Sequence, residues 1–247
     1  MIVTYRGHVN RLRQNGCLDP IADKTMLTEV ILVMAAMMVA AVGQWILFDQ
    51  TLPVFQSLDS RIKHEWVGRI IGSASQIGII LFWLFEGASS NWGQSLILGY
   101  TLHDILHMLT YETDITAYIH HIVAVTVTGL FKMTMTPEQA ESAALATVVL
   151  ESTSPFLSLT WLMKRGGLDN HPLFTYISGF AALFFGFMRC GVFPWVMMKK
   201  MDRVTALVAM PFLILNFYWF WKILKMLKRV LDKKEVAFSS SEQSREE

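Results

Sequence analysis

The sequence predicts an all-α protein, a polytopic transmembrane helical bundle of six or seven spans that encloses a membrane-embedded polar cavity. Three observations predict this class. The chain of 247 residues is 53% hydrophobic and only 17% charged, whereas soluble domains carry about 25% charged residues. Its mean hydropathy is +0.40. It also contains a series of apolar stretches of roughly 20 residues, the length that a helix needs to cross a bilayer.

Seven apolar stretches are candidate spans. In chain order they are residues 27–48, 67–85, 95–111, 115–131, 140–162, 174–198 and 204–227. The first two are strong candidates. The third and fourth are short and carry histidine and aspartate, and the last three each carry ionisable or amide side chains, so the total is six or seven.

The organisation predicted around these spans is one membrane domain with short polar ends. Residues 1–26 have no apolar core of the kind a cleaved signal peptide needs, so the first span is expected to act as the insertion signal. The membrane domain covers 27–234. The tail, 235–247, is polar and charged and is predicted to be disordered. The net charge of +1 argues against a nucleic-acid partner, which would favour a basic surface.

Polar residues on the third span share one helix face. Tyr100, Asp104, His107 and Tyr111 are spaced at i, i+4, i+7 and i+11, which places them in one stripe. His103 lies at the edge of that stripe. Because ionisable groups are costly inside a bilayer, the stripe is expected to face the interior of the bundle.

The fourth and fifth spans carry similar stripes. Asp114, His121 and Thr128 are seven residues apart, while His120 points about 100° away from His121. Four residues of the fifth span are spaced at i, i+4, i+7 and i+11 and so share one face: Thr147, Glu151, Ser154 and Ser158. Three neighbouring stripes of this kind indicate a polar chamber enclosed by helices.

Two further polar residues allow alternative interpretations. Asn216 on the seventh span fits an interhelical hydrogen bond better than it fits chemistry. Arg189 on the sixth span needs a partner in the bilayer. An ion pair with Glu151 or Asp104 and a clamp for a substrate carboxylate or phosphate explain it equally well.

Three arrangements fit this cluster: acyl transfer by histidine, a metal site, and binding of a lipid head group by Arg189, the histidines and the tyrosines without chemistry. Acyl transfer is considered first. His121 would be the base or nucleophile, Asp114 or Asp104 would orient it, and His120 would be an acid or oxyanion partner. The predicted catalytic set is His121, His120, Asp114, Asp104 and His103. The predicted substrate-binding set is His107, Tyr100, Tyr111, Glu151, Ser154, Arg189 and Asn216.

Metal chemistry is the alternative for the same histidines. His103 and His107, at i and i+4, could place two ligands on one zinc ion with His120 or His121 as a third. The chain has only seven histidines, fewer than membrane di-iron oxygenases use. We therefore expect no di-iron site, while a mononuclear zinc site stays open. The predicted site itself contains no metal and no cofactor, and acyl-CoA enters only as a substrate.

Six short motifs, in order, resemble the TLC domain, which ceramide synthases share with translocation-associated membrane proteins and a set of TLC-domain-containing proteins. The residues that carry the resemblance are Trp66 and Arg69; His103–Asp104; Asp114 with His120–His121; Glu151, Ser154, Pro155, Phe156 and Trp161; Arg189; and Asn216, Trp219 and Phe220. In the synthases a second His-Asp follows the His-His pair. Here Leu150 and Glu151 stand at those positions, so the chain is similar to the non-synthase branch.

The resemblance implies a role in lipid metabolism. The leading hypothesis is an acyltransferase-like protein that moves a fatty acyl group from acyl-CoA or a phospholipid to a lysophospholipid or long-chain amine. The alternatives are a non-enzymatic lipid-binding or cargo-escort protein and a zinc-dependent hydrolase of amide-linked lipids. The resemblance implies the endoplasmic reticulum, with the Golgi or plasma membrane as alternatives. Membrane lipids are the expected partners, and a homo-oligomer is left open.

Overall fold

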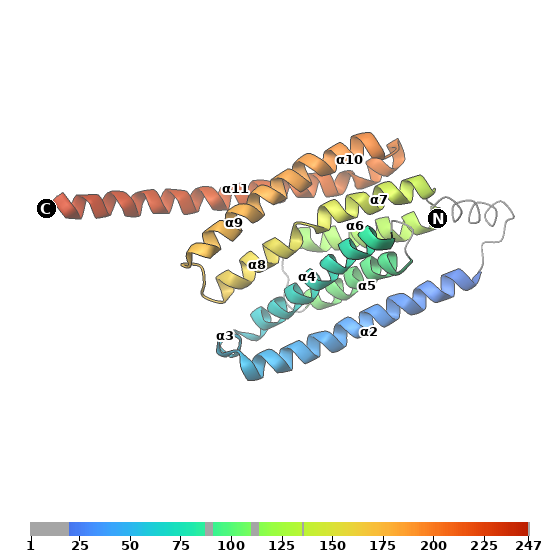
Figure 1. Ribbon diagram of the computed structural model, residues 1–247, viewed down its shortest axis with the longest axis horizontal. Coiled ribbons are helices and arrows are strands. Elements are labelled where there is room, and N and C mark those ends of the chain that lie inside the picture. Colours follow the sequence, from blue (N-terminus) through green and yellow to red (C-terminus); the bar gives the residue numbers. More distant parts are fainter. Residues whose placement is uncertain (1–19, 87–90, 110–113, 135, 247) are drawn as a thin grey trace.

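A computed structural model describes residues 20–86, 91–109, 114–134 and 136–246. Within those ranges every regular element is helical (Figure 1). The helices are α2 (Pro20–Thr51), α3 (Pro53–Gln56), α4 (Ser60–Glu86), α5 (Asn91–Met108), α6 (Ile115–Thr134), α7 (Pro137–Glu151), α8 (Ser154–Arg165), α9 (Pro172–Phe185), the π-helix η1 (Gly186–Val192), α10 (Phe193–Lys200) and α11 (Arg203–Glu246).

The helices form a ring of six rods with α2 packed on its outside. Two of the rods are composite, α7 followed by α8, and α9 followed by η1 and α10. Each rod contacts the next one around the ring. The order is α4, α5, α6, α11, the α9–η1–α10 rod and the α7–α8 rod, which contacts α4 and closes the ring. Helix α2 touches α4 and α5 and lies at one edge of the bundle (Figure 1).

Five helical stretches are long and apolar enough to cross a membrane: Leu27–Thr51, Ser60–Glu86, Glu141–Arg165, Pro172–Lys200 and Arg203–Lys228. The predicted helical membrane bundle is confirmed. The third and fourth predicted spans form α5 and α6, which are shorter, and Asp104 of α5 faces His121 of α6. The number of crossings, six or seven, stays a prediction.

Polarity in the bundle is distributed as a bilayer requires. The outer surface is apolar, with side chains such as Val39, Leu183 and Val204 mostly exposed. Buried polar residues gather between the helices instead, among them Gln76, Asp104 and Arg189. Since lipid offers no hydrogen bonds, polar side chains are stable only where other helices supply partners.

Two composite rods bend at prolines. Pro155 has no N–H and clashes with the carbonyl four residues earlier, and the helix breaks between Glu151 and Ser154. Pro194 likewise cannot donate to the carbonyl of Cys190, which lies inside η1. Single π-helical turns often occur at functional sites, and this one carries Arg189.

The C-terminal tail differs from the sequence-based prediction. Helix α11 continues to Glu246 and extends away from the bundle (Figure 1), so residues 235–246 are helical where a disordered tail is predicted. No glycine or proline follows Pro211 to stop the helix. At the other end α2 already begins at Pro20, and residues 1–19 lie outside the described residues.

Close packing of α2 on α5 depends on Gly99. A Cβ atom at this position would lie 2.6 Å from Cγ1 and 2.9 Å from Cβ of Val33. We expect Gly99→Ala to push the two helices apart and to lower the free energy of unfolding by about 1–3 kcal/mol, the usual cost of overpacking. Thermal unfolding in detergent measures this.

The matched control for this prediction is Gly43→Ala on α2, where no atom lies within 4 Å of the added Cβ. Its stability should be unchanged or slightly raised, because alanine favours helix over glycine. Equal melting temperatures for the Gly99→Ala variant and the wild type would show that α2 does not pack closely on α5.

Candidate functional site

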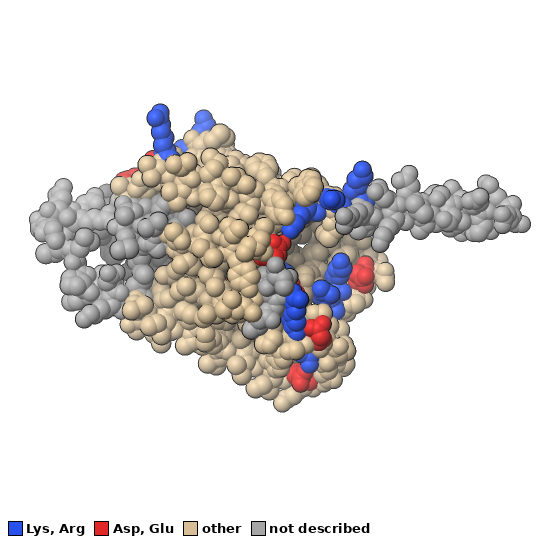
Figure 2. All heavy atoms as spheres, turned by 180° about the vertical axis from the view of Figure 1, so that it is seen from behind, with Lys and Arg blue, Asp and Glu red and all other residues tan. Residues whose placement is uncertain are grey.

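A cavity of about 440 Å³ lies inside the ring of helices, within the range of roughly 300–1,000 Å³ typical of ligand pockets. All six rods of the ring contribute to its wall. Figure 2 shows a hollow on the back face of the molecule, with acidic side chains at its edge and Lys and Arg side chains around it. Residues from each of the polar stripes predicted on the third, fourth and fifth spans therefore line this one cavity.

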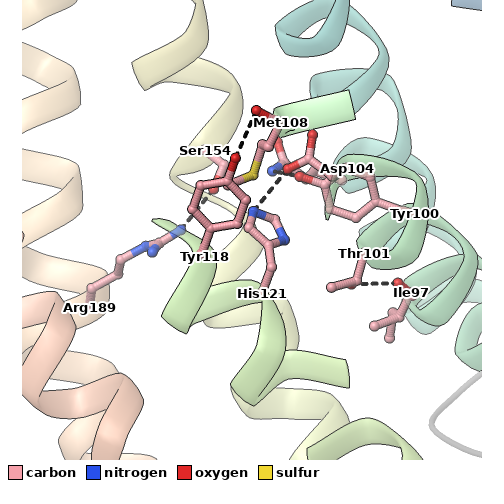
Figure 3. A network of polar contacts seen from close by, with 10 residues as sticks. Ile97, Tyr100, Thr101, Asp104, Met108, Tyr118, His121, Ser154 and Arg189 are labelled. Atoms are coloured by element: carbon pink, nitrogen blue, oxygen red, sulfur yellow. Dashed lines mark hydrogen bonds and ion pairs between the residues drawn. The ribbon is translucent and has the colours of Figure 1, made fainter. Parts of the chain in front are cut away.

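His121 and Asp104 form a hydrogen-bonded pair in the cavity wall. His121 Nε2 lies 2.8 Å from Asp104 Oδ2, and both side chains are only 12% exposed. The two residues point toward each other from α6 and α5 (Figure 3). When Nε2–H donates to the carboxylate, Nδ1 is the nitrogen that accepts a proton from a third group. This is the arrangement of a histidine base oriented by an acid.

Asp114, the other carboxylate that the sequence offered as a partner for His121, bonds to Lys222 and Thr116 instead. Its Oδ2 accepts a hydrogen bond from Lys222 Nζ at 2.9 Å, and its Oδ1 accepts from the backbone N–H and hydroxyl of Thr116. Asp114 and His121 share a helix face, but seven residues of α-helix span about 10 Å. Asp114 therefore caps α6 and binds α11 at one end of the cavity.

His120 also lines the cavity, although it points away from the face that His121 shares with Asp114. Its ring makes edge-on contacts with His121, Trp219 and Phe212 at centroid distances of 5.2, 5.1 and 5.3 Å. Its Nδ1 is buried and has no hydrogen-bond partner among the described residues. Helix α11 thus holds His120 next to His121, where its polar edge can reach a bound molecule.

Arg189 is held by three neutral oxygens, two at the start of α8 and one on α11. Its Nε donates to Thr153 Oγ1 at 2.7 Å, Nη1 to Asn216 Oδ1 at 3.2 Å and Nη2 to Ser154 Oγ at 2.7 Å. The side chain lines the cavity and points toward Ser154 (Figure 3). Asn216 does not line the cavity, so it positions Arg189 and makes the interhelical hydrogen bond that the sequence favoured.

Glu151 and Tyr100 complete the deep part of the cavity. Glu151 lines the cavity together with Arg189, and the two side chains interact electrostatically. The Tyr100 hydroxyl accepts a hydrogen bond from Gln76 Nε2 at 3.2 Å, and the Tyr100 ring lies 6.3 Å from that of His121. Both residues were predicted as substrate-binding. Their position in the wall is compatible with that role.

His103 and His107 lie outside the cavity wall. Their rings stack at 5.6 Å, and His107 contacts His64 edge-on at 5.7 Å. In the described part of the chain, no group of three or more His, Cys, Asp or Glu side chains is arranged to hold a metal ion. The structure separates these two histidines from His120 and His121, the third ligands considered above. Tyr111 lies outside the described residues.

Sequence reasoning did not include Gln76, Lys222 and Trp219 in the site, although all three line the cavity. Gln76 is a lone amide in a strongly apolar span, and such a residue also fits a packing role. Lys222 and Trp219 are three residues apart and share a face of α11. Trp219 lies one turn after Asn216, so a search of that face would have found it, whereas Lys222 lies about 120° away from Asn216 around the helix.

Comparisons with known proteins agree with these motifs. A family model for the TLC domain matches residues 28–225. The TLC domain-containing protein 4 A of Dictyostelium discoideum is 24% identical over 201 residues, which cover 69% of this chain and 77% of the relative. No solved structure gives a significant match. The position where ceramide synthases have a second histidine carries Leu150, which is buried in an apolar cluster rather than in the cavity.

The Asp114–Lys222 bond predicts a pH dependence. Hydrogen bonds from Lys222 and then Thr116 lower the pKa of the Asp114 carboxyl from 3.8 to about 2. A depressed pKa in the folded state stabilises the protein above the unfolded pKa, and this contribution is lost as the pH falls from roughly 4 toward 2. Thermal unfolding should therefore show a wild-type advantage over Asp114→Asn at pH 6 that shrinks toward pH 2. An advantage that stays constant over this range would contradict the bond.

Proposed function

This chain belongs to the TLC domain family of membrane proteins, and on that basis we propose that it is a lipid acyltransferase. The reaction would move a fatty acyl group from acyl-CoA or a phospholipid to a lysophospholipid or long-chain amine. The observation that carries the proposal is the 2.8 Å contact of His121 with Asp104 in the wall of the cavity between the helices. The proposal includes the endoplasmic reticulum as the site of residence.

The proposed step uses His121 as a general base. Asp104 holds Nε2, and Nδ1 removes the proton from the acceptor hydroxyl or amine as its oxygen or nitrogen attacks the acyl carbonyl carbon. A C–O or C–N bond forms while the C–S bond of acyl-CoA, or the ester C–O bond of a phospholipid donor, breaks. The proton on His121 then passes to the leaving thiolate or alkoxide, so the base is regenerated. The ring of His120, 5.2 Å from that of His121, would donate a hydrogen bond to the oxyanion.

Burial in the membrane supports this assignment. Only 12% of each side chain of the His121–Asp104 pair is exposed, and electrostatic interactions are stronger where water is excluded. Packing of His120 against Trp219 and Phe212 limits the positions that its ring can take. Pre-organised groups of this kind lower the cost of reaching the transition state.

The alternative is a lipid-binding or cargo-escort protein that carries out no chemistry. The observation that favours it is that Arg189, Glu151 and Gln76 put groups suited to binding in the same cavity. In that case the His121–Asp104 pair would serve only to grip a head group. Substitution of His121 would then weaken lipid binding, with no turnover to lose.

Activity of the purified protein tests the proposal. With an acyl-CoA donor and lysophospholipid or long-chain amine acceptors, His121→Ala should lower the rate about 10²–10⁴-fold, the usual contribution of a general base. Asp104→Asn should also lower it, because the amide no longer stabilises the imidazolium. Mass spectrometry of extracted lipids measures the acyl product.

The matched control is His171→Ala, because His171 is an exposed histidine that caps α9 through Leu173 and does not line the cavity. It should keep the wild-type rate. Intact-protein mass spectrometry after incubation with acyl-CoA separates two routes, since an acyl adduct lost in His121→Ala indicates a nucleophile rather than a base. Full turnover by His121→Ala would reject the assignment.

A further inference from the structure

Arg189 places a permanent positive charge in the wall of a cavity within the membrane. The side chain is 4% exposed, and an arginine guanidinium does not lose its proton in proteins. A buried charge is stable only when it is paired or fully hydrogen-bonded. The partners of this guanidinium therefore indicate what the cavity is built to hold.

Those partners leave the charge only partly compensated. A guanidinium has five N–H groups, and three of them donate to the neutral oxygens of Thr153, Ser154 and Asn216. Within the described ranges no carboxylate oxygen lies within the 4.0 Å limit of a direct ion pair with Arg189. The guanidinium thus retains donors and charge on a residue that lines the cavity.

The acidic groups nearby do not take the place of a bound anion. Asp104 is engaged with His121 at 2.8 Å. Glu151 acts on Arg189 through space, but it makes no direct ion pair with it.

We propose that Arg189 binds the oxyanion of a lipid, a carboxylate or a phosphate, inside the cavity. Thr153, Ser154 and Asn216 fix the plane of the guanidinium, and η1 directs it inward. The remaining N–H groups can then bind two oxygens of a carboxylate or phosphate, the geometry that arginine favours. This inference rests on the proposed function in one respect, because it assumes that the cavity holds a lipid, and it identifies the class of that lipid as anionic.

Lipid binding to the purified full-length protein in detergent tests the inference without any turnover. The probes are oleate, oleoyl lysophosphatidic acid and the neutral monoolein. An anionic probe should bind about 10–100-fold more tightly than monoolein, the ratio that a charge-assisted hydrogen bond supplies. Arg189→Gln should remove this preference and leave monoolein binding unchanged. Preference for oleate indicates a carboxylate ligand, and preference for lysophosphatidic acid indicates a phosphate.

Two further variants keep the test decisive. Lys225→Gln removes an exposed positive charge that packs on Trp221 outside the cavity, and it should bind both anionic probes as the wild type does. Glu151→Gln removes the negative charge that faces Arg189, so it should bind the anionic probes more tightly. If Arg189→Gln does not fold, Glu151→Gln decides, since unchanged or weaker anion binding would overturn the inference.

The same experiments separate this inference from the proposed acyl transfer. An active enzyme whose Arg189→Gln variant binds oleate and lysophosphatidic acid as tightly as the wild type would refute the anion site alone. A protein without turnover that loses anion binding in Arg189→Gln would refute acyl transfer alone. In the wild type, equal binding of charged and neutral probes would also overturn the anion site.

Discussion

The structure depends most on the way Arg189 is held inside the bundle. Its guanidinium joins η1 to the α7–α8 break through Thr153 and Ser154, and to α11 through Asn216. A cation at this depth tolerates little misplacement, since losing one hydrogen bond leaves charge uncompensated in a medium of low dielectric constant. The requirement to satisfy Arg189 therefore sets how three rods of the ring fit together.

Irregular helix geometry is what makes that arrangement available. Pro155 interrupts the α7–α8 rod beside the residues that accept from Arg189, and Pro194 follows the π-helical turn that carries it. Both prolines remove a backbone hydrogen bond from a membrane helix, which neighbouring helices must compensate. Arg189 in η1 and Ser154 next to the α7–α8 break line the cavity, so each irregular segment places a polar side chain there.

Much of the site follows from periodicity. Tyr100 and Asp104 on α5, and Glu151 and Ser154 near the α7–α8 break, line the cavity as their spacing predicts. Other positions were not predictable. His107 shares the α5 stripe but stacks on His103 outside the cavity wall. The stripe is longer than the cavity, so a residue near its end packs against a neighbouring helix instead, here through His64 of α4. The family resemblance is confirmed, whereas the roles of these residues in chemistry stay predictions.

By itself, the sequence determined that this protein is a helical membrane bundle of the TLC domain family with a polar interior. The length of an apolar stretch and the spacing of polar residues along a helix are local properties. Because lipid offers no hydrogen bonds, the polar face of a membrane helix must turn toward the interior of the bundle. Tertiary structure decided which groups meet. His121 bonds to Asp104 and not Asp114, and Arg189 bonds to neutral oxygens and not to Glu151. These pairings depend on the distances between helices, and the spacing of residues along one helix carries no information about those distances.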